Sequence, residues 1–157
     1  MTGIENAGAN SYVLLQIGRQ RFALSSEIVA ELAPPVRLHS IPHTSPLVTG
    51  VIVRRGHIVP VYDAAPVLGA KSSFSHRFYL IARREFDGGT ELSAIPVNGE
   101  CELATGEVQP PRAERPVCVT GTLTIGEEVL DVLDFEKLIT SQPAQANASA
   151  VPTEARS

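Results

Sequence analysis

The chain has 157 residues, of which 43% are hydrophobic and 19% charged, and its formal net charge is -4. These values are typical of a globular protein, and the length allows one domain or two small subdomains around a shared core. The acidic balance gives no general attraction to nucleic acid or anionic membranes. Two isolated cysteines provide neither a disulfide framework nor a zinc-site pattern, and the sequence shows no signal peptide or membrane-spanning apolar run. We therefore expect a cytoplasmic protein.

Both ends of the sequence have the composition of flexible segments. Residues 1–10 are small and polar without periodicity, which predicts a flexible N-terminal tail. Residues 141–157 consist largely of Ala, Gln, Ser, Pro and Thr, which bury too little apolar surface to offset their ordering entropy. This segment is predicted to be a disordered C-terminal tail, and the folded body is predicted over residues 11–140.

The folded body opens with two strand-like runs, residues 12–17 and 22–24, joined by a polar turn that contains Gly18. Residues 25–27 offer a helix N-cap followed by an acid, so residues 28–32 form either one helical turn or a continued strand. The sequence leaves both open. The prolines between residues 33 and 46 exclude a helix there, and this loop leads to the next hairpin.

The central hairpin spans residues 50–63, where two runs rich in β-branched residues flank the turn Arg54-Arg55-Gly56-His57. The arms are predicted to be largely buried, and the tip is predicted to carry both guanidinium groups into solvent. A short helical turn is predicted next, begun by Asp63 and ended by Gly69.

The second half of the chain repeats this order of elements. It contains a hairpin over residues 78–97, a Pro-rich loop, a second hairpin, and a short helix at 135–139 that Asp134 caps. The letters VTGVI at residues 48–52 recur as VTGTL at 119–123, and VPVYD at 59–63 recurs as LDVLD at 130–134. A duplicated β-unit follows.

Many short strands, Pro-rich loops and the lack of a long amphipathic helix predict an all-β fold, either a small barrel or a sandwich. With the duplication added, the prediction is two related barrel-like subdomains over about residues 11–70 and 76–140. The joint between them is a preferred place for a partner to dock.

The order of elements resembles the CheW-like domain, the coupling module of bacterial chemosensory arrays, over about residues 11–140. The Arg-Gly hairpin followed by Ile-Val-Pro-Val is the most specific part of the resemblance. The matching segments are residues 12–15, 22–24, 29–31, 41–42, 50–63, 119–121 and 133–139.

The resemblance implies two intertwined SH3-like five-stranded β-barrels with short helical turns, a short C-terminal helix, no catalysis and no cofactor. It implies an adaptor that joins chemoreceptor signalling tips to the regulatory domain of a CheA-like histidine kinase, in chemotaxis or a related pathway such as surface motility. Such a protein is recruited from the cytoplasm to membrane-associated receptor arrays.

Family positions linked to receptor contact map onto Val29, Glu31, Gly50 and Arg55, and Arg54 is a further candidate beside them. The second repeat has no guanidinium at its hairpin tip, so the hairpin fold does not require the Arg pair. A guanidinium offers a bidentate fork to a partner carboxylate. Val29 and Glu31 would lie on one face if their segment is extended.

Gly50 has a structural explanation as well, because its counterpart Gly121 is retained in the second repeat. Both copies are expected to need close backbone approach or a positive φ at this position. Any binding role of Gly50 is therefore secondary.

Two other function classes are weaker. A nucleic-acid-binding barrel would use an arginine-lined groove, but the net charge is acidic and base-stacking aromatics are few; those arginines are Arg19, Arg21, Arg54, Arg55, Arg83 and Arg84. An enzyme would need partners for Asp63, Asp131 or Asp134, and the sequence supplies none. His39 and His43 have ligand spacing only in a helix, which Pro42 disfavours, so no metal is expected.

Overall fold

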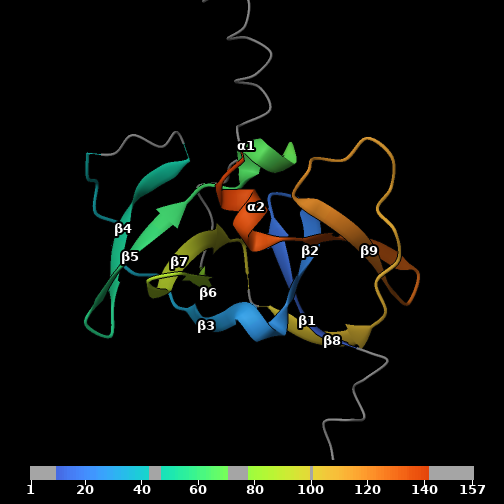
Figure 1. Cartoon of the computed structure of the whole chain (residues 1–157), viewed down its shortest axis with the longest axis horizontal. Helices are drawn as coiled ribbons and strands as arrows, with labels where there is room; N and C mark the ends of the chain where they lie inside the picture. The colour runs from blue at the N-terminus through green and yellow to red at the C-terminus, as the bar shows by residue number, and fades with distance from the viewer. Residues whose placement is uncertain (1–9, 43–46, 71–77, 100, 142–157) are drawn as a thin grey trace, which may run out of the picture.

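The computed structural model describes residues 10–42, 47–70, 78–99 and 101–141 (Figure 1). The predicted tails, residues 1–10 and 141–157, lie outside this part apart from their innermost residues, and Asn10 already belongs to the first strand. Within the described residues the strands form two five-stranded sheets. These sheets lie on opposite sides of the molecule, with two short helices between them (Figure 1).

The first sheet combines strands from the start of the chain with strands from its end, in the order β8-β1-β2-β10-β9. Its strands are β1 (Asn10–Ile17), β2 (Gln20–Ser25), β8 (Glu102–Gly106), β9 (Val119–Ile125) and β10 (Glu128–Leu133).

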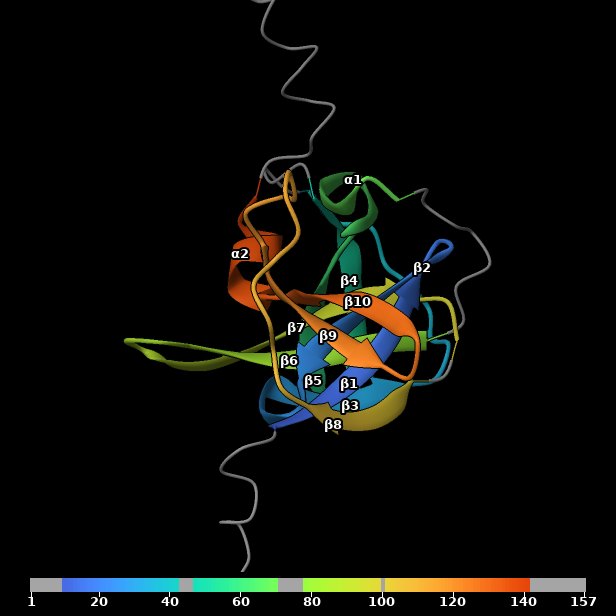
Figure 2. The same ribbon diagram turned by 90° about the vertical axis from the view of Figure 1, so that its right-hand side faces the viewer.

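The second sheet uses the middle of the chain, in the order β3-β6-β7-β5-β4. Its strands are β3 (Val29–Ala33), β4 (Val48–Arg54), β5 (His57–Tyr62), β6 (Phe78–Phe86) and β7 (Gly89–Val97). The hairpin of β6 and β7 projects well beyond the rest of the folded body (Figure 2).

The two sheets correspond strand by strand, since β8-β1-β2-β10-β9 and β3-β6-β7-β5-β4 place equivalent strands of the two repeats in the same order. In each sheet a hairpin from one repeat meets strands from the other through a parallel pair, β2 with β10 and β5 with β7. The all-β fold of two intertwined five-stranded subdomains is confirmed. The boundaries at about 11–70 and 76–140 mark the two repeats, and each sheet takes strands from both repeats.

The segment after β2 takes the chain from the first sheet to the second. The 3₁₀ turn η2 (Ser26–Ile28) redirects the chain, and β3 then pairs with β6 of the other repeat. The structure thus combines the two conformations that the sequence left open, a single helical turn followed by a strand. The short helices α1 (Ala65–Leu68) and α2 (Phe135–Ile139) follow β5 and β10.

The helix ends match the predicted capping residues in part. The carboxylate of Asp134 accepts a hydrogen bond from the Lys137 N–H and caps α2. The N-cap of α1 is Ala64 and not Asp63, although Asp63 accepts a hydrogen bond from the Ala65 N–H at 3.2 Å. Gly69 ends α1 with a φ of 72°, a left-handed conformation that glycine adopts at low cost.

Buried side chains form three clusters, because alternate residues of a strand face opposite sides of its sheet. In β1, Tyr12 and Leu14 pack inside the first barrel, whereas Val13 and Leu15 join the central cluster between the barrels. In β6, Tyr79 and Ile81 pack inside the second barrel. The central cluster is the largest and includes α1, α2 and strands of both sheets. The two barrels therefore share one core.

Candidate functional site

The tip of the β4–β5 hairpin carries the two predicted arginines. Arg54 pairs with His57, and Arg55-Gly56 forms a two-residue turn in which both φ angles are positive, 51° and 82°. Such turns match the twist of the strands that they join. In the equivalent β9–β10 hairpin the first turn residue is Gly126, at a φ of 64°. Arg55 thus occupies a position that suits glycine, at a backbone cost of about 1 kcal/mol.

The Glu31 carboxylate lies between the two guanidinium groups. Its Oε2 accepts a hydrogen bond from Arg54 Nε at 2.5 Å, and its Oε1 accepts one from Arg55 Nε at 3.0 Å. Glu31 lies on β3, Arg54 is the last residue of β4, and Arg55 follows it in the turn. β3 and β4 are the two edge strands of the second sheet. The ion pairs therefore cross between the sheet edges.

The charges of this cluster, which we call the tip cluster (Glu31, Arg54 and Arg55), do not cancel. One carboxylate faces two guanidinium groups, and the side chain of Arg55 is 70% exposed while that of Glu31 is 23% exposed. The hydrogen bond from Arg54 is the main cause that lowers the pKa of Glu31, so its carboxylate stays charged. The cluster presents one net positive charge, and Arg55 is its accessible member.

Val29 and Glu31 do not share the expected face. The pairing register of β3 with β6 shifts between these residues, because β3 holds one extra residue there. An extra residue of this kind interrupts the alternation of side chains. Val29 packs against the central cluster, whereas Glu31 reaches the hairpin tip.

Gly50 is buried beneath a neighbouring backbone segment. His39 and Val51 exchange two backbone hydrogen bonds of 2.8 Å, which brings the His39 carbonyl over Gly50. Gly121 has the same environment, since a Cβ there would approach the Gln109 carbonyl oxygen within 2.8 Å. The expectation of close backbone approach in both repeats is confirmed. Gly50 is therefore buried under the segment that covers it and is not itself part of the exposed surface.

Replacing Gly50 by Ala is expected to destabilise the protein by about 1–3 kcal/mol, because the new Cβ collides with the His39 carbonyl oxygen. The midpoint of urea denaturation measures this loss. Gly88→Ala is the control, since a Cβ at Gly88 meets no atom within 4 Å. Equal midpoints for both variants would contradict the close approach as the reason for glycine.

A groove of about 660 Å³ lies between the first barrel, α2, η2 and the projecting β6–β7 hairpin. Apolar side chains of Ile28, Val108, Val132 and Phe135 contribute to its wall, and charged residues of β6 and α2 lie beside them. The sequence predicted a docking place at the joint of the subdomains. It named Arg83 and Arg84, which line this groove, only for the nucleic-acid-binding alternative. The lining residues of the groove come from six separate parts of the chain, which no local pattern connects.

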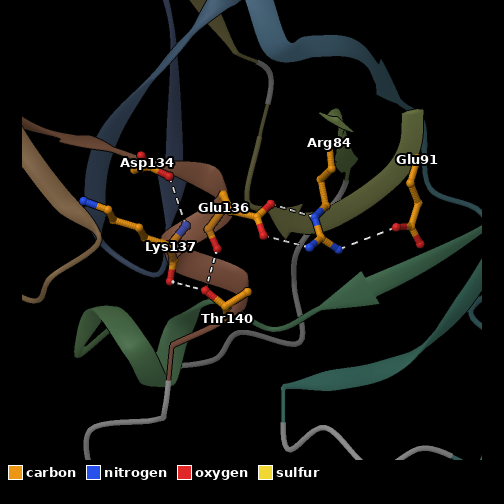
Figure 3. A network of polar contacts seen from close by, with 6 residues as sticks. All are labelled: Arg84, Glu91, Asp134, Glu136, Lys137 and Thr140. Atoms are coloured by element: carbon orange, nitrogen blue, oxygen red, sulfur yellow. Dashed lines mark hydrogen bonds and ion pairs between the residues drawn. The ribbon is translucent and has the colours of Figure 1, made fainter. Parts of the chain in front are cut away.

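Arg84 and Glu136, which both line the groove, belong to an ion-pair network (Figure 3). Arg84 Nε and Nη2 donate to the two carboxylate oxygens of Glu136, both at 2.9 Å, and Glu91 lies 3.7 Å from Arg84 Nη1. The Arg84 hydrogen bond is the main cause that lowers the pKa of Glu136. The projecting hairpin is therefore tied to α2 by a bidentate pair between charged groups.

The arginines that a nucleic-acid-binding barrel would use are largely engaged by protein acceptors. Arg21 pairs with Glu102 and Glu128, Arg84 with Glu136, and Arg83 donates to the Glu27 carbonyl at 2.7 Å. Carboxylates compensate much of the positive charge that a phosphate backbone requires. No specific observation favours this alternative.

Metal and thiol chemistry have little support in the described residues. Within residues 10–42, 47–70, 78–99 and 101–141, no group of three His, Cys, Asp or Glu side chains is arranged to hold a metal ion. His43 lies outside this part. Burial raises the pKa of Cys101 and Cys118 to about 11, which keeps the thiols protonated and poorly nucleophilic. In the same residues no helix has the length and apolarity to cross a membrane.

The family model of the CheW-like domain matches residues 11–143. Among solved structures, the chain is similar to the crystal structure of the scaffolding protein TtCheW from Thermoanaerobacter tengcongensis, with a TM-score of 0.70 and 19% identity. The similarity covers 85% of this chain and 94% of that chain, and at this identity it shows the fold. No curated protein sequence gives a match.

Proposed function

The chain belongs to the CheW-like domain family, and from this premise we propose that it is a non-catalytic adaptor that couples chemoreceptor signalling tips to a CheA-like histidine kinase. The family match covers residues 11–143 and so includes almost the whole described body. The pathway is chemotaxis or a related chemosensory output such as surface motility. The protein would act in the cytoplasm, at receptor arrays to which its partners recruit it.

The observation that carries this proposal is the state of Arg55. It holds a left-handed backbone conformation where the other repeat has glycine, and its side chain is 70% exposed. Glu31 accepts a hydrogen bond from Arg55 Nε, and the outer edge of this guanidinium offers two further donors to a partner carboxylate. Arg55 has an unfavourable backbone conformation, and Glu31 holds its side chain in one orientation. These two features fit a binding residue better than an ordinary solvent-exposed turn residue.

The groove supplies the apolar half of the same surface. Its wall includes Ile28, which directly precedes β3, so the segment 28–31 leads from the groove to the tip cluster. Apolar walls flanked by charged residues suit the apolar face of an amphipathic helix. We assign this surface to the receptor signalling tip, with Val29 and Gly50 supporting it from within, and we assign the kinase regulatory domain to another part of the barrels.

Arg55→Gly is expected to reduce receptor affinity at least about tenfold while leaving the free energy of unfolding within about 1 kcal/mol of the native value. The variant copies the turn residue of the second repeat, so the hairpin remains compatible with the fold. Arg55→Glu should lose receptor binding completely, because it places a second carboxylate beside Glu31.

The measurement is a calorimetric titration against a soluble receptor signalling-tip fragment from the same genome, repeated with the kinase regulatory domain. Kinase affinity should remain unchanged in both variants, and denaturation curves should confirm that both fold. An Arg55→Gly variant that binds the receptor fragment as tightly as the native protein would refute the assignment of the tip cluster.

A further inference from the structure

Residues 107–118 form a strap that connects β8 to β9 and contributes one wall of the groove. Gln109 and Thr122 exchange two backbone hydrogen bonds of 2.8 Å, and Thr122 Oγ1 donates to the Pro110 carbonyl at 3.2 Å. Val108 fills the space beside Gly121 that a side chain would otherwise occupy, and it also lines the groove. The position of the strap thus determines the position of Val108 in the wall of the groove.

The buried carboxylate of Asp131 forms ion pairs with two arginines in the middle of the strap. Asp131 Oδ1 lies 2.8 Å from Arg112 Nη2, and its Oδ2 lies 3.0 Å from Arg115 Nη2. The side chain of Asp131 is 4% exposed, whereas those of the two arginines are 48% and 35% exposed. Each carboxylate oxygen is therefore taken by a different strap residue. We call these three residues the strap lock.

The second barrel shows that the fold does not depend on this acid. The repeats place Pro60 at the position of Asp131, since VPVYD at residues 59–63 corresponds to LDVLD at 130–134. The segment that covers Gly50 is joined to β4 by the His39–Val51 bridge, with no carboxylate available from residue 60. The strap lock is thus a feature of the first barrel and not of the barrel fold in general.

We propose that Asp131, Arg112 and Arg115 are positioning residues for partner binding. They hold the strap against β10 and so keep Val108 in place as a wall of the groove. A partner helix then meets a wall that is already ordered, which lowers the entropy that binding costs. The lock sets affinity without contact between its carboxylate and the partner. This inference rests on the assignment of the groove to the receptor.

The test compares the native chain with the triple variant D131N/R112Q/R115Q, which removes the buried charge together with its partners so that none is left unpaired. Hydrogen exchange at the Gln109 and Thr122 amides should accelerate about tenfold or more, since these amides report strap opening. Affinity for the receptor signalling-tip fragment should fall about tenfold, and affinity for the kinase regulatory domain should not change.

Two further variants separate positioning from general stability. R112K/R115K retains both positive charges beside Asp131, so its receptor affinity should lie between that of the triple variant and that of the native chain. R21Q breaks the ion pairs of Arg21 with Glu102 and Glu128 on the same barrel, away from the strap, and should change neither exchange at Gln109 nor receptor affinity.

The possible failures are distinguishable. Native affinity for the receptor fragment in the triple variant, with faster strap exchange, overturns the positioning role and leaves the proposed function intact. Unchanged hydrogen exchange at Gln109 and Thr122 would show that the strap lock does not hold the strap. This result also overturns the positioning role. A native chain that does not bind the fragment refutes the receptor assignment itself, and the inference about the lock falls with it.

Discussion

A fragment of residues 1–74 is expected to remain unfolded, and so is a fragment of residues 75–157, whereas an equimolar mixture of the two should fold. Each repeat contains two hairpins that belong to different sheets, β1–β2 with β4–β5 in the first and β6–β7 with β9–β10 in the second. An isolated two-stranded hairpin is marginally stable in water. The parallel pairs that complete each sheet need the other fragment.

Far-ultraviolet circular dichroism and urea denaturation measure this result. Residues 26–99 provide a control fragment of the same length as 1–74, because they contain every strand of the second sheet. This control should show more β-structure than residues 1–74, although it lacks the part of the central cluster that β1, β2, β9, β10 and α2 supply. A cooperative unfolding transition for residues 1–74 alone would contradict the exchange of strands between repeats.

Removing both strap arginines is expected to cost on the order of 3 kcal/mol of unfolding free energy, because R112A/R115A leaves a buried carboxylate without partners. Replacing the acid instead of the arginines is predicted to cost less unfolding free energy. D131N removes the buried charge and keeps an oxygen as acceptor, while the arginines reach solvent, so its cost should be about 1 kcal/mol. The asymmetry follows from burial, since Asp131 is 4% exposed and Arg112 is 48% exposed.

Urea denaturation midpoints of the two variants test this order. R21Q again serves as the control, because Arg21 binds carboxylates that are 70% and 43% exposed and its loss should cost less than about 1 kcal/mol. A D131N variant that is less stable than R112A/R115A would show that the interaction does not depend on a buried, paired charge.

The hairpins, their turns and the duplication were predictable because each depends on neighbouring residues. Alternating β-branched residues determine a strand, and residues such as Arg55-Gly56 determine a tight turn. Comparison of the repeats also predicted why Gly50 is glycine. The exposure of Arg55 at the tip followed from the hairpin pattern. The same prediction was wrong for Arg54, because its side chain is only 25% exposed and pairs with Glu31.

The partners of charged residues were not predictable in the same way. Asp131 was an acid without a partner in the sequence, and the structure pairs it with Arg112 and Arg115. Glu31 and Arg54 are 23 positions apart and meet because their strands are the two edges of one curved sheet. Such contacts depend on how the sheet closes, which hydrophobic periodicity does not encode.

The sequence by itself determined an all-β chain of two repeats, the residues at the hairpin tip and the need for glycine beneath the covering segments. Only the tertiary structure decided that each barrel combines strands of both repeats, that the Val29–Glu31 segment contains a bulge, and that a groove with a fastened strap lies between the barrels. The reason is physical. Local sequence determines the length of a strand and which of its residues face the core. Which other strand it pairs with depends on burial of the central core that both repeats share.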